Sequence, residues 1–130
     1  CGHCVVHCSA AAGDALGHYV HCRMLLDAVR VVFAPLVGRM SDEQLRRYML
    51  CMDGFTPGQR EKDVCGGVII AYVMYRVYCV VRRLPGDVRL LQADVVGHVV
   101  AAVRTASTMT ARSRRILGSI TRAGGGRSTA

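Results

Sequence analysis

Apolar residues between positions 18 and 37 recur at intervals of three and four, the period of one face of an α-helix. The residues that share this face are Val20, Met24, Leu25, Ala28, Val29, Val32 and Phe33. This spacing predicts an amphipathic helix that starts near His18. Pro35 and Gly38 are expected to end or kink it, because proline cannot donate a backbone hydrogen bond and glycine favours helix ends.

A second helix is predicted to begin at Ser41. The run SDEQ at residues 41–44 matches a capping box, in which the serine hydroxyl and the glutamine side chain each accept a hydrogen bond from the other residue's amide. We expect this helix to reach about Met52. Its outward residues would be Arg46 and Arg47, and its inward residues Leu45, Tyr48, Met49 and Met52.

The longest apolar run covers residues 64–81 and is broken only by Arg76. A membrane-spanning helix needs about twenty apolar residues. This run is slightly short, contains the Gly66–Gly67 pair and carries a charge, so we predict a core helix and regard membrane contact as disfavoured. One side of the helix is expected to carry Tyr72, Tyr75 and Cys79, and the inward side Ile70, Val73, Met74, Val77 and Val81.

A further helix is predicted over residues 88–106, with Asp87 as its N-cap. Its buried residues would be Leu91, Val95, Val99, Ala102 and Val103. After Ser107 the apolar pattern gives way to Ser, Thr, Gly and Arg; residues 111–123 are compatible with a short basic helix, and the final glycine run with disorder. The chain therefore reads as all-α, a small bundle of about four helices with a basic tail.

Charge is concentrated at one end of this 130-residue chain, which has a net charge of +8. Residues 1–103 hold eleven basic and nine acidic residues, whereas the last twenty-seven hold six arginines and no acid. Arginine forms bidentate contacts with phosphate. The tail is thus a candidate for binding RNA or DNA through Arg112, Arg114, Arg115 and Arg122.

The first 22 residues contain four of the chain's seven cysteines and four of its five histidines: Cys1, His3, Cys4, His7, Cys8, His18, His21 and Cys22. Zn²⁺ prefers four such thiolate and imidazole ligands in a tetrahedron. A C-x2-C pair suits a tight turn, and an H-x3-C pair places both ligands on one face of a helical turn. The best-spaced set is Cys1, Cys4, His18 and Cys22, with Cys8, His21 and His7 as alternates.

Disulfides are the other common use of clustered cysteines. The odd total of seven cysteines and the interleaved histidines disfavour a disulfide framework. Cys51, Cys65 and Cys79 lie singly in apolar helices, where buried free thiols are common, and receive no predicted chemistry. Three regions follow: a zinc-knuckle-like segment over residues 1–22, a helical domain over 23–106 and a tail over 107–130.

The run GDALGHYVHC at residues 13–22, followed at once by the apolar residues 24–26, resembles the zinc knuckle near the end of reverse transcriptases of LINE-type (non-LTR) retrotransposons. The resemblance covers about the first thirty-five residues and extends loosely to residues 71–83. It implies zinc ligands at Cys1, Cys4, His18 and Cys22, although the loop between the two pairs is longer here than in the family pattern. It also implies a larger polypeptide upstream.

These features predict a non-catalytic region of a retroelement-type reverse transcriptase that binds nucleic acid and a structural zinc ion. The sequence contains no aromatic-x-Asp-Asp turn for polymerase metals, and its nine acids are scattered. The expected location is intracellular, nuclear or cytoplasmic. The alternative is an orphan helical protein, associated with membranes through residues 64–81, in which the Cys/His cluster is incidental.

Overall fold

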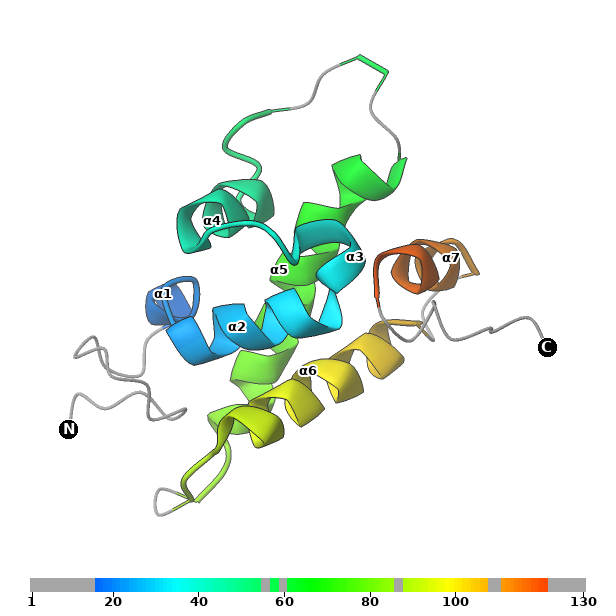
Figure 1. Cartoon of the computed structure of the whole chain (residues 1–130). Coiled ribbons are helices and arrows are strands. Elements are labelled where there is room, and N and C mark those ends of the chain that lie inside the picture. The colour runs from blue at the N-terminus through cyan, green and yellow to red at the C-terminus, as the bar shows by residue number, and fades with distance from the viewer. Residues whose placement is uncertain (1–15, 55–56, 59–60, 86–87, 108–110, 122–130) are drawn as a thin grey trace.

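The computed structural model describes residues 16–54, 57–58, 61–85, 88–107 and 111–121, and the regular structure in these residues is helical (Figure 1). The helices are α1 (Leu16–Tyr19), α2 (Arg23–Val32), α3 (Ala34–Val37), α4 (Asp42–Met49), α5 (Glu61–Val81), α6 (Gln92–Ser107) and α7 (Ala111–Ile120). Helix α5 contacts α1, α4, α6 and α7, while α2 packs mainly on α6. The all-α prediction is confirmed for the described residues, which form seven helices instead of about four.

The helix predicted over residues 18–37 is divided into α1, α2 and α3. The kink expected at Pro35 is present as the break at Phe33, and the helix ends before Gly38 as expected, but the break at Cys22 was not predicted. Cys22 precedes α2 with extended backbone angles, φ −70° and ψ 110°, and Phe33 interrupts the helix at φ −101° and ψ 30°. Pro35 then occupies the first turn of α3. Backbone N–H groups in a first turn have no partner within the helix, so the N–H that proline lacks removes no helical hydrogen bond there. The apolar face nevertheless continues through the breaks and buries Leu25, Leu26, Ala28, Val29, Val32 and Phe33.

The capping box predicted at the start of α4 is confirmed. The amide of Gln44 donates to the Ser41 hydroxyl at 3.2 Å, and the amide of Ser41 donates to the Gln44 side chain at 2.9 Å. The helix ends at Met49, because Cys51 adopts a left-handed backbone with φ of 54°. Met52 is therefore exposed, and the prediction that it points inward is wrong.

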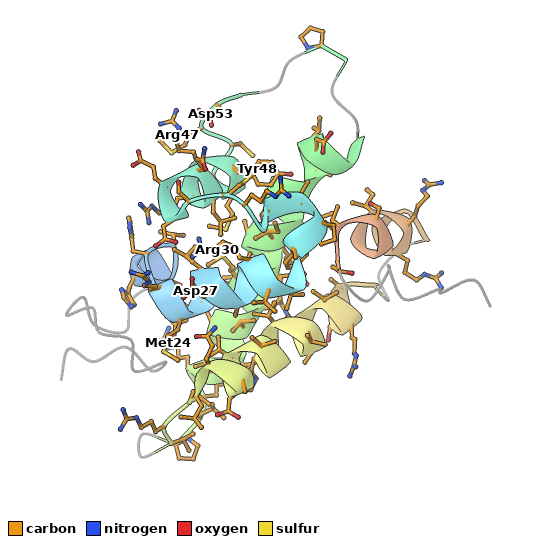
Figure 2. All side chains as sticks on the ribbon, viewed as in Figure 1. Met24, Asp27, Arg30, Arg47, Tyr48 and Asp53 are labelled. Carbon is orange, nitrogen blue, oxygen red and sulfur yellow. The ribbon has the colours of Figure 1, made fainter. Side chains whose placement is uncertain are left out.

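Polar contacts of α2 connect it to two other helices (Figure 2). The Arg30 guanidinium binds Asp27 on the same helix and Asp42 of α4, the latter at 2.5 Å. Burial of Arg30 opposes its charge, but the hydrogen bonds with Asp42 and Asp27 outweigh this cost and raise its pKa. The Gln92 side-chain amide donates to the Met24 carbonyl at 3.0 Å and so links α6 to α2.

The inward face predicted for the long apolar run is confirmed in α5, where Ile70, Val73, Met74, Val77 and Val81 are buried. By length and composition alone, residues Asp63–Val81 form a helix that could cross a membrane, and 44% of the apolar window is buried against the rest of the protein. A core helix of a soluble protein passes the same test. The buried residues of this window are those of the inward side, and the outward side of the helix is exposed.

The Gly66–Gly67 pair lies where α4 approaches α5 most closely. A Cβ atom on Gly67 would fall within 3.0 Å of the Tyr48 backbone carbonyl oxygen, and one on Gly66 would collide with the Tyr48 hydroxyl. That hydroxyl donates a hydrogen bond to the Asp63 carbonyl at 2.9 Å. Burial is the main cause that raises the pKa of Tyr48 to about 12. The two glycines therefore serve helix packing, although they weaken α5 locally.

Helix α6 begins at Gln92 instead of residue 88, and Asp94 caps it by accepting a hydrogen bond from the Leu91 amide at 2.8 Å. Asp87, the predicted N-cap, lies outside the described residues. Leu91 is exposed, so its predicted burial is wrong, and Leu90 is buried in its place. The remaining predicted core residues of this helix are buried as expected: Val95, Val99, Ala102 and Val103.

Helix α7 packs against α5, α6 and α3 through the buried residues Ile116 and Ile120. The sequence predicts a tail from residue 107 onward, outside the helical domain, with a short helix within residues 111–123. The short helix is confirmed. The structure, however, includes Ala111–Ile120 in the bundle. Residues 122–130 lie outside the described part.

We expect Gly67→Ala to destabilise the protein by about 1–3 kcal/mol, the usual cost of overpacking. The new methyl group would collide with the backbone of Tyr48, which cannot move without shifting α4. Gly97→Ala in α6 is the matched control, because a Cβ there meets no atom within 4 Å. That change should stabilise the protein by about 0.4–1 kcal/mol. Urea unfolding measures both, and equal effects would contradict the packing role of Gly67.

We expect the stability of the wild-type protein to fall more steeply than that of Tyr48→Phe as the pH rises from 10 to 12. The folded protein raises the pKa of Tyr48 to about 12, whereas an unfolded tyrosine titrates near 10. The folded state therefore holds this proton more tightly, and the resulting stabilisation is complete below pH 10 and lost between these values. Urea unfolding across this range tests the prediction, and parallel curves for the two proteins would refute it.

Candidate functional site

Two of the four predicted zinc ligands, His18 and Cys22, lie in the described part of the chain. Cys1, Cys4 and the alternates Cys8 and His7 fall outside it. Among the described residues, no three His, Cys, Asp or Glu side chains come together as a metal-binding group. The structure thus positions one half of the predicted site.

His18 and Cys22 stand on either side of a tight turn between α1 and α2. The His21 amide donates to the His18 carbonyl at 2.8 Å, and the Cys22 amide donates to the Tyr19 carbonyl at 3.4 Å. The chain leaves the helix after Tyr19 and enters the next helix after Cys22. The prediction that both ligands share one face of a continuous helical turn is therefore wrong.

The two side chains are nevertheless both buried. The exposed fraction is 4% for His18 and 0% for Cys22, and the Nδ1 atom of His18 is itself shielded from solvent. The alternate ligand His21 is exposed. A buried imidazole and a buried thiol are donors suited to a structural zinc ion. Burial therefore favours His18 over His21 in the proposed ligand set.

Aromatic contacts fix this turn to the centre of the bundle. The His18 and Tyr19 rings meet edge to face, with centroids 6.1 Å apart. The Tyr19 ring packs at 82° to that of Tyr78 in α5, with centroids 4.6 Å apart. The Arg82 guanidinium donates to the Tyr78 hydroxyl at 2.8 Å and lies 5.6 Å from the centre of its ring. The position of His18 is consequently coupled to the C-terminal end of α5.

Of the four arginines predicted to bind nucleic acid, Arg114 and Arg115 are exposed on α7, opposite its buried isoleucines. The side chain of Arg112 and all of Arg122 lie outside what the structure describes. The described part of this basic segment is thus a helix held by the core. Arg114 and Arg115 are exposed to solvent.

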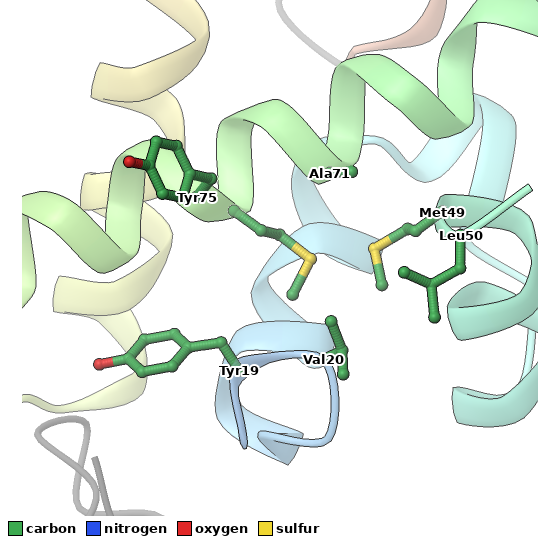
Figure 3. A pocket seen from close by; sticks show the side chains of 7 residues that line it. Tyr19, Val20, Met49, Leu50, Ala71 and Tyr75 are labelled. Carbon is green, nitrogen blue, oxygen red and sulfur yellow. The ribbon is translucent and has the colours of Figure 1, made fainter. Parts of the chain in front are cut away.

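Sequence reasoning missed a hollow where α1, α4 and α5 meet (Figure 3). The hollow has a volume of about 180 Å³ and an almost wholly apolar lining that includes Tyr19, Met49, Met74 and Tyr75. Periodicity places Tyr75 on the side of α5 away from the core. The hollow depends on how three separate helices meet, which helical periodicity does not specify.

Three further cysteines, Cys51, Cys65 and Cys79, are free thiols of intermediate exposure. Tyr75 forms a hydrogen bond with Cys79, one turn further along α5, and this bond is the main cause that raises the pKa of Tyr75. None of the three is part of a metal-binding group in the described region.

We compared the chain with models of protein families, with curated proteins and with solved structures. None of the three comparisons gave a match.

Proposed function

We propose that this chain is a non-catalytic helical region that is tied together by a structural zinc ion and binds nucleic acid. The zinc ligands would be Cys1, Cys4, His18 and Cys22. The observation that carries the zinc proposal is the burial of His18 and Cys22 at the edge of the core. Buried polar ligand residues beside a Cys/His-rich segment fit a closed site better than an exposed, catalytic one.

The zinc ion would join the N-terminal segment to the bundle. Cys22 directly precedes α2, and His18 contacts the aromatic residues that connect α1 to α5. Binding a metal at these two residues would restrain both helices at once. Metal binding then contributes directly to the free energy of folding, as in other small zinc domains.

The nucleic-acid part of the proposal rests on charge. The chain carries a net charge of +8, and sixteen of its seventeen basic residues are arginine. Exposed arginines neutralise phosphates and release counterions, which is the main source of sequence-independent affinity. Together with the resemblance of the N-terminal segment, this supports our proposal that the chain is the C-terminal part of a reverse transcriptase of the LINE type.

Membrane association through residues 64–81 is the rival function. Helix α5 has the length and composition of a span. Its inward face, however, contacts α4, α6 and α7, so insertion would require the bundle to open. Binding of nucleic acid to exposed arginines needs no such rearrangement, and we therefore prefer it.

We expect Cys22→Ser to abolish stoichiometric zinc binding and to remove the stabilisation by added zinc. Cys51→Ser should change neither, since Cys51 lies in the turn after α4. Because Cys22 is fully buried, Leu25→Ala provides a matched control: it removes a buried side chain next to the site and should lower stability while zinc binding is retained. The measurements are metal content of the purified protein and melting temperature with and without zinc.

The zinc proposal fails if the wild-type protein contains no stoichiometric metal. It fails equally if Cys22→Ser and Leu25→Ala lose zinc to the same extent, since the loss would then follow from general unfolding. The choice between His18 and His21 is tested by replacing each with alanine: only His18→Ala should lower the zinc content.

We expect the affinity for single-stranded nucleic acid to depend less steeply on salt after four arginines are changed to glutamine: Arg112, Arg114, Arg115 and Arg122. The slope of log affinity against log salt should fall by about 0.7 for each phosphate that is no longer neutralised. Substitution is preferable to truncation, because α7 contributes Ile116 and Ile120 to the core. Arg39→Gln, at an exposed turn, is the control. An unchanged slope in the fourfold variant would exclude this segment as the phosphate-binding surface.

A further inference from the structure

The outward side of α5 combines aromatic and basic side chains in a way that the zinc site and the tail do not explain. Tyr72 is 37% exposed, Tyr75 is 49% exposed and Val68 is 55% exposed. Arg76 is exposed beside them. Large apolar side chains on a helix are normally turned toward a partner or the core. This face therefore requires an explanation of its own.

The spacing along α5 places these side chains together. Tyr72 and Tyr75 are three residues apart, so their Cβ atoms are neighbours at about 5–6 Å, and Arg76 follows Tyr72 by four residues. Arg82 lies in the turn directly after α5, seven residues beyond Tyr75. Its guanidinium is held by the Tyr78 hydroxyl and ring, so this cation has a fixed place.

The hollow beside Tyr75 adds a receptor for a flat apolar group (Figure 3). Its volume of about 180 Å³ is comparable with an apolar cavity of about 150 Å³ that holds one benzene ring. Tyr75 forms one wall, and Met49 and Met74 form others. A ring that stacks on Tyr75 can therefore enter the hollow without displacing a polar group.

The charge of this face selects an anionic partner. From residue 64 to residue 83 the chain contains no acidic residue, while Arg76, Arg82 and Arg83 are exposed. A partner that offers both flat rings and regularly spaced negative charges matches this surface. Single-stranded nucleic acid has both, and aromatic side chains with nearby arginines are how many proteins bind it.

We propose that the outward face of α5 binds single-stranded nucleic acid, with bases stacked on Tyr72 and Tyr75 and phosphates bound by Arg76 and Arg82. The proposal rests on the nucleic-acid function proposed above and assigns it a site on the helical domain, separate from the arginines of α7. Base faces and phosphates are common to RNA and DNA, so the test uses both.

The experiment measures fluorescence anisotropy of labelled oligo(U) and oligo(dT) of about fifteen nucleotides, near the upper end of known site sizes, with the whole 130-residue chain purified in the presence of zinc. Tyr72→Leu and Tyr75→Leu retain apolar contact but remove the ring. Each should weaken binding about 10-fold, within the range measured for the removal of base stacking. Tyr75→Phe keeps the ring and should bind within about 2-fold of wild type.

Two further variants separate charge from stacking. Arg76→Gln should reduce the slope of log affinity against log salt by about 0.7, the value for one neutralised phosphate on a single strand. Leu91→Ala removes an apolar side chain that is more exposed than either tyrosine, just before α6, and should leave binding unchanged. Melting temperatures show whether each variant is folded, and a comparison of Tyr75→Leu with Tyr75→Phe remains informative if the leucine variant is less stable.

The outcomes distinguish a failure of the proposed site on α5 from a failure of the proposed nucleic-acid function. Binding of either oligonucleotide that weakens in both leucine variants supports the proposed face. Binding that is unchanged in them but abolished by substitution of the α7 arginines overturns this proposal and leaves the proposed function intact. No binding by the wild-type protein overturns both. Binding to vesicles of phosphatidylcholine and phosphatidylserine that survives both leucine substitutions, without binding to oligonucleotides, identifies an anionic lipid surface instead and also overturns the proposal.

Discussion

Burial of the inner face of α5 is the interaction on which the arrangement of this protein depends. Helices that precede it in the chain, α1 and α4, and helices that follow it, α6 and α7, all contact it. None of them is long enough to form a core alone, and α2 is held mainly through α6. Because these contacts join segments that are distant in sequence, the bundle is expected to unfold as one cooperative unit.

Much of the bundle could be predicted because side-chain periodicity follows directly from helical geometry. The buried face of α5, the capping box at Ser41 and most of the core of α6 were all predictable in this way. Helix ends were less predictable. The break at Phe33 is marked by Pro35 two residues later. The break at Cys22 has no glycine or proline beside it, and Cys51 takes a left-handed backbone that a non-glycine residue rarely adopts, so no sequence signal marks these two.

The candidate sites were predictable only in part, because residue spacing can be read from the sequence and the packing of separate helices cannot. Residue type and spacing singled out His18 and Cys22 as candidate ligand residues, but not that a turn separates them or that His21 faces solvent. The exposed tyrosines of α5 could be assigned to one side of a helix from periodicity. The hollow beside them could not, because its walls come from three helices whose relative placement is set by packing.

The glycine pair of α5 also bears on how this architecture would tolerate sequence change. Most core positions accept one aliphatic residue for another of similar volume. Position 67 cannot, since even a methyl group there meets the backbone of α4, and a methyl group at position 66 requires the side chains of Tyr48 and Leu36 to move. Among divergent sequences that share this arrangement, a pair of adjacent glycines about six positions into the long helix should therefore be retained where the hydrophobic residues around it have changed. Such a pair offers a criterion for finding distant relatives when overall identity is too low to align.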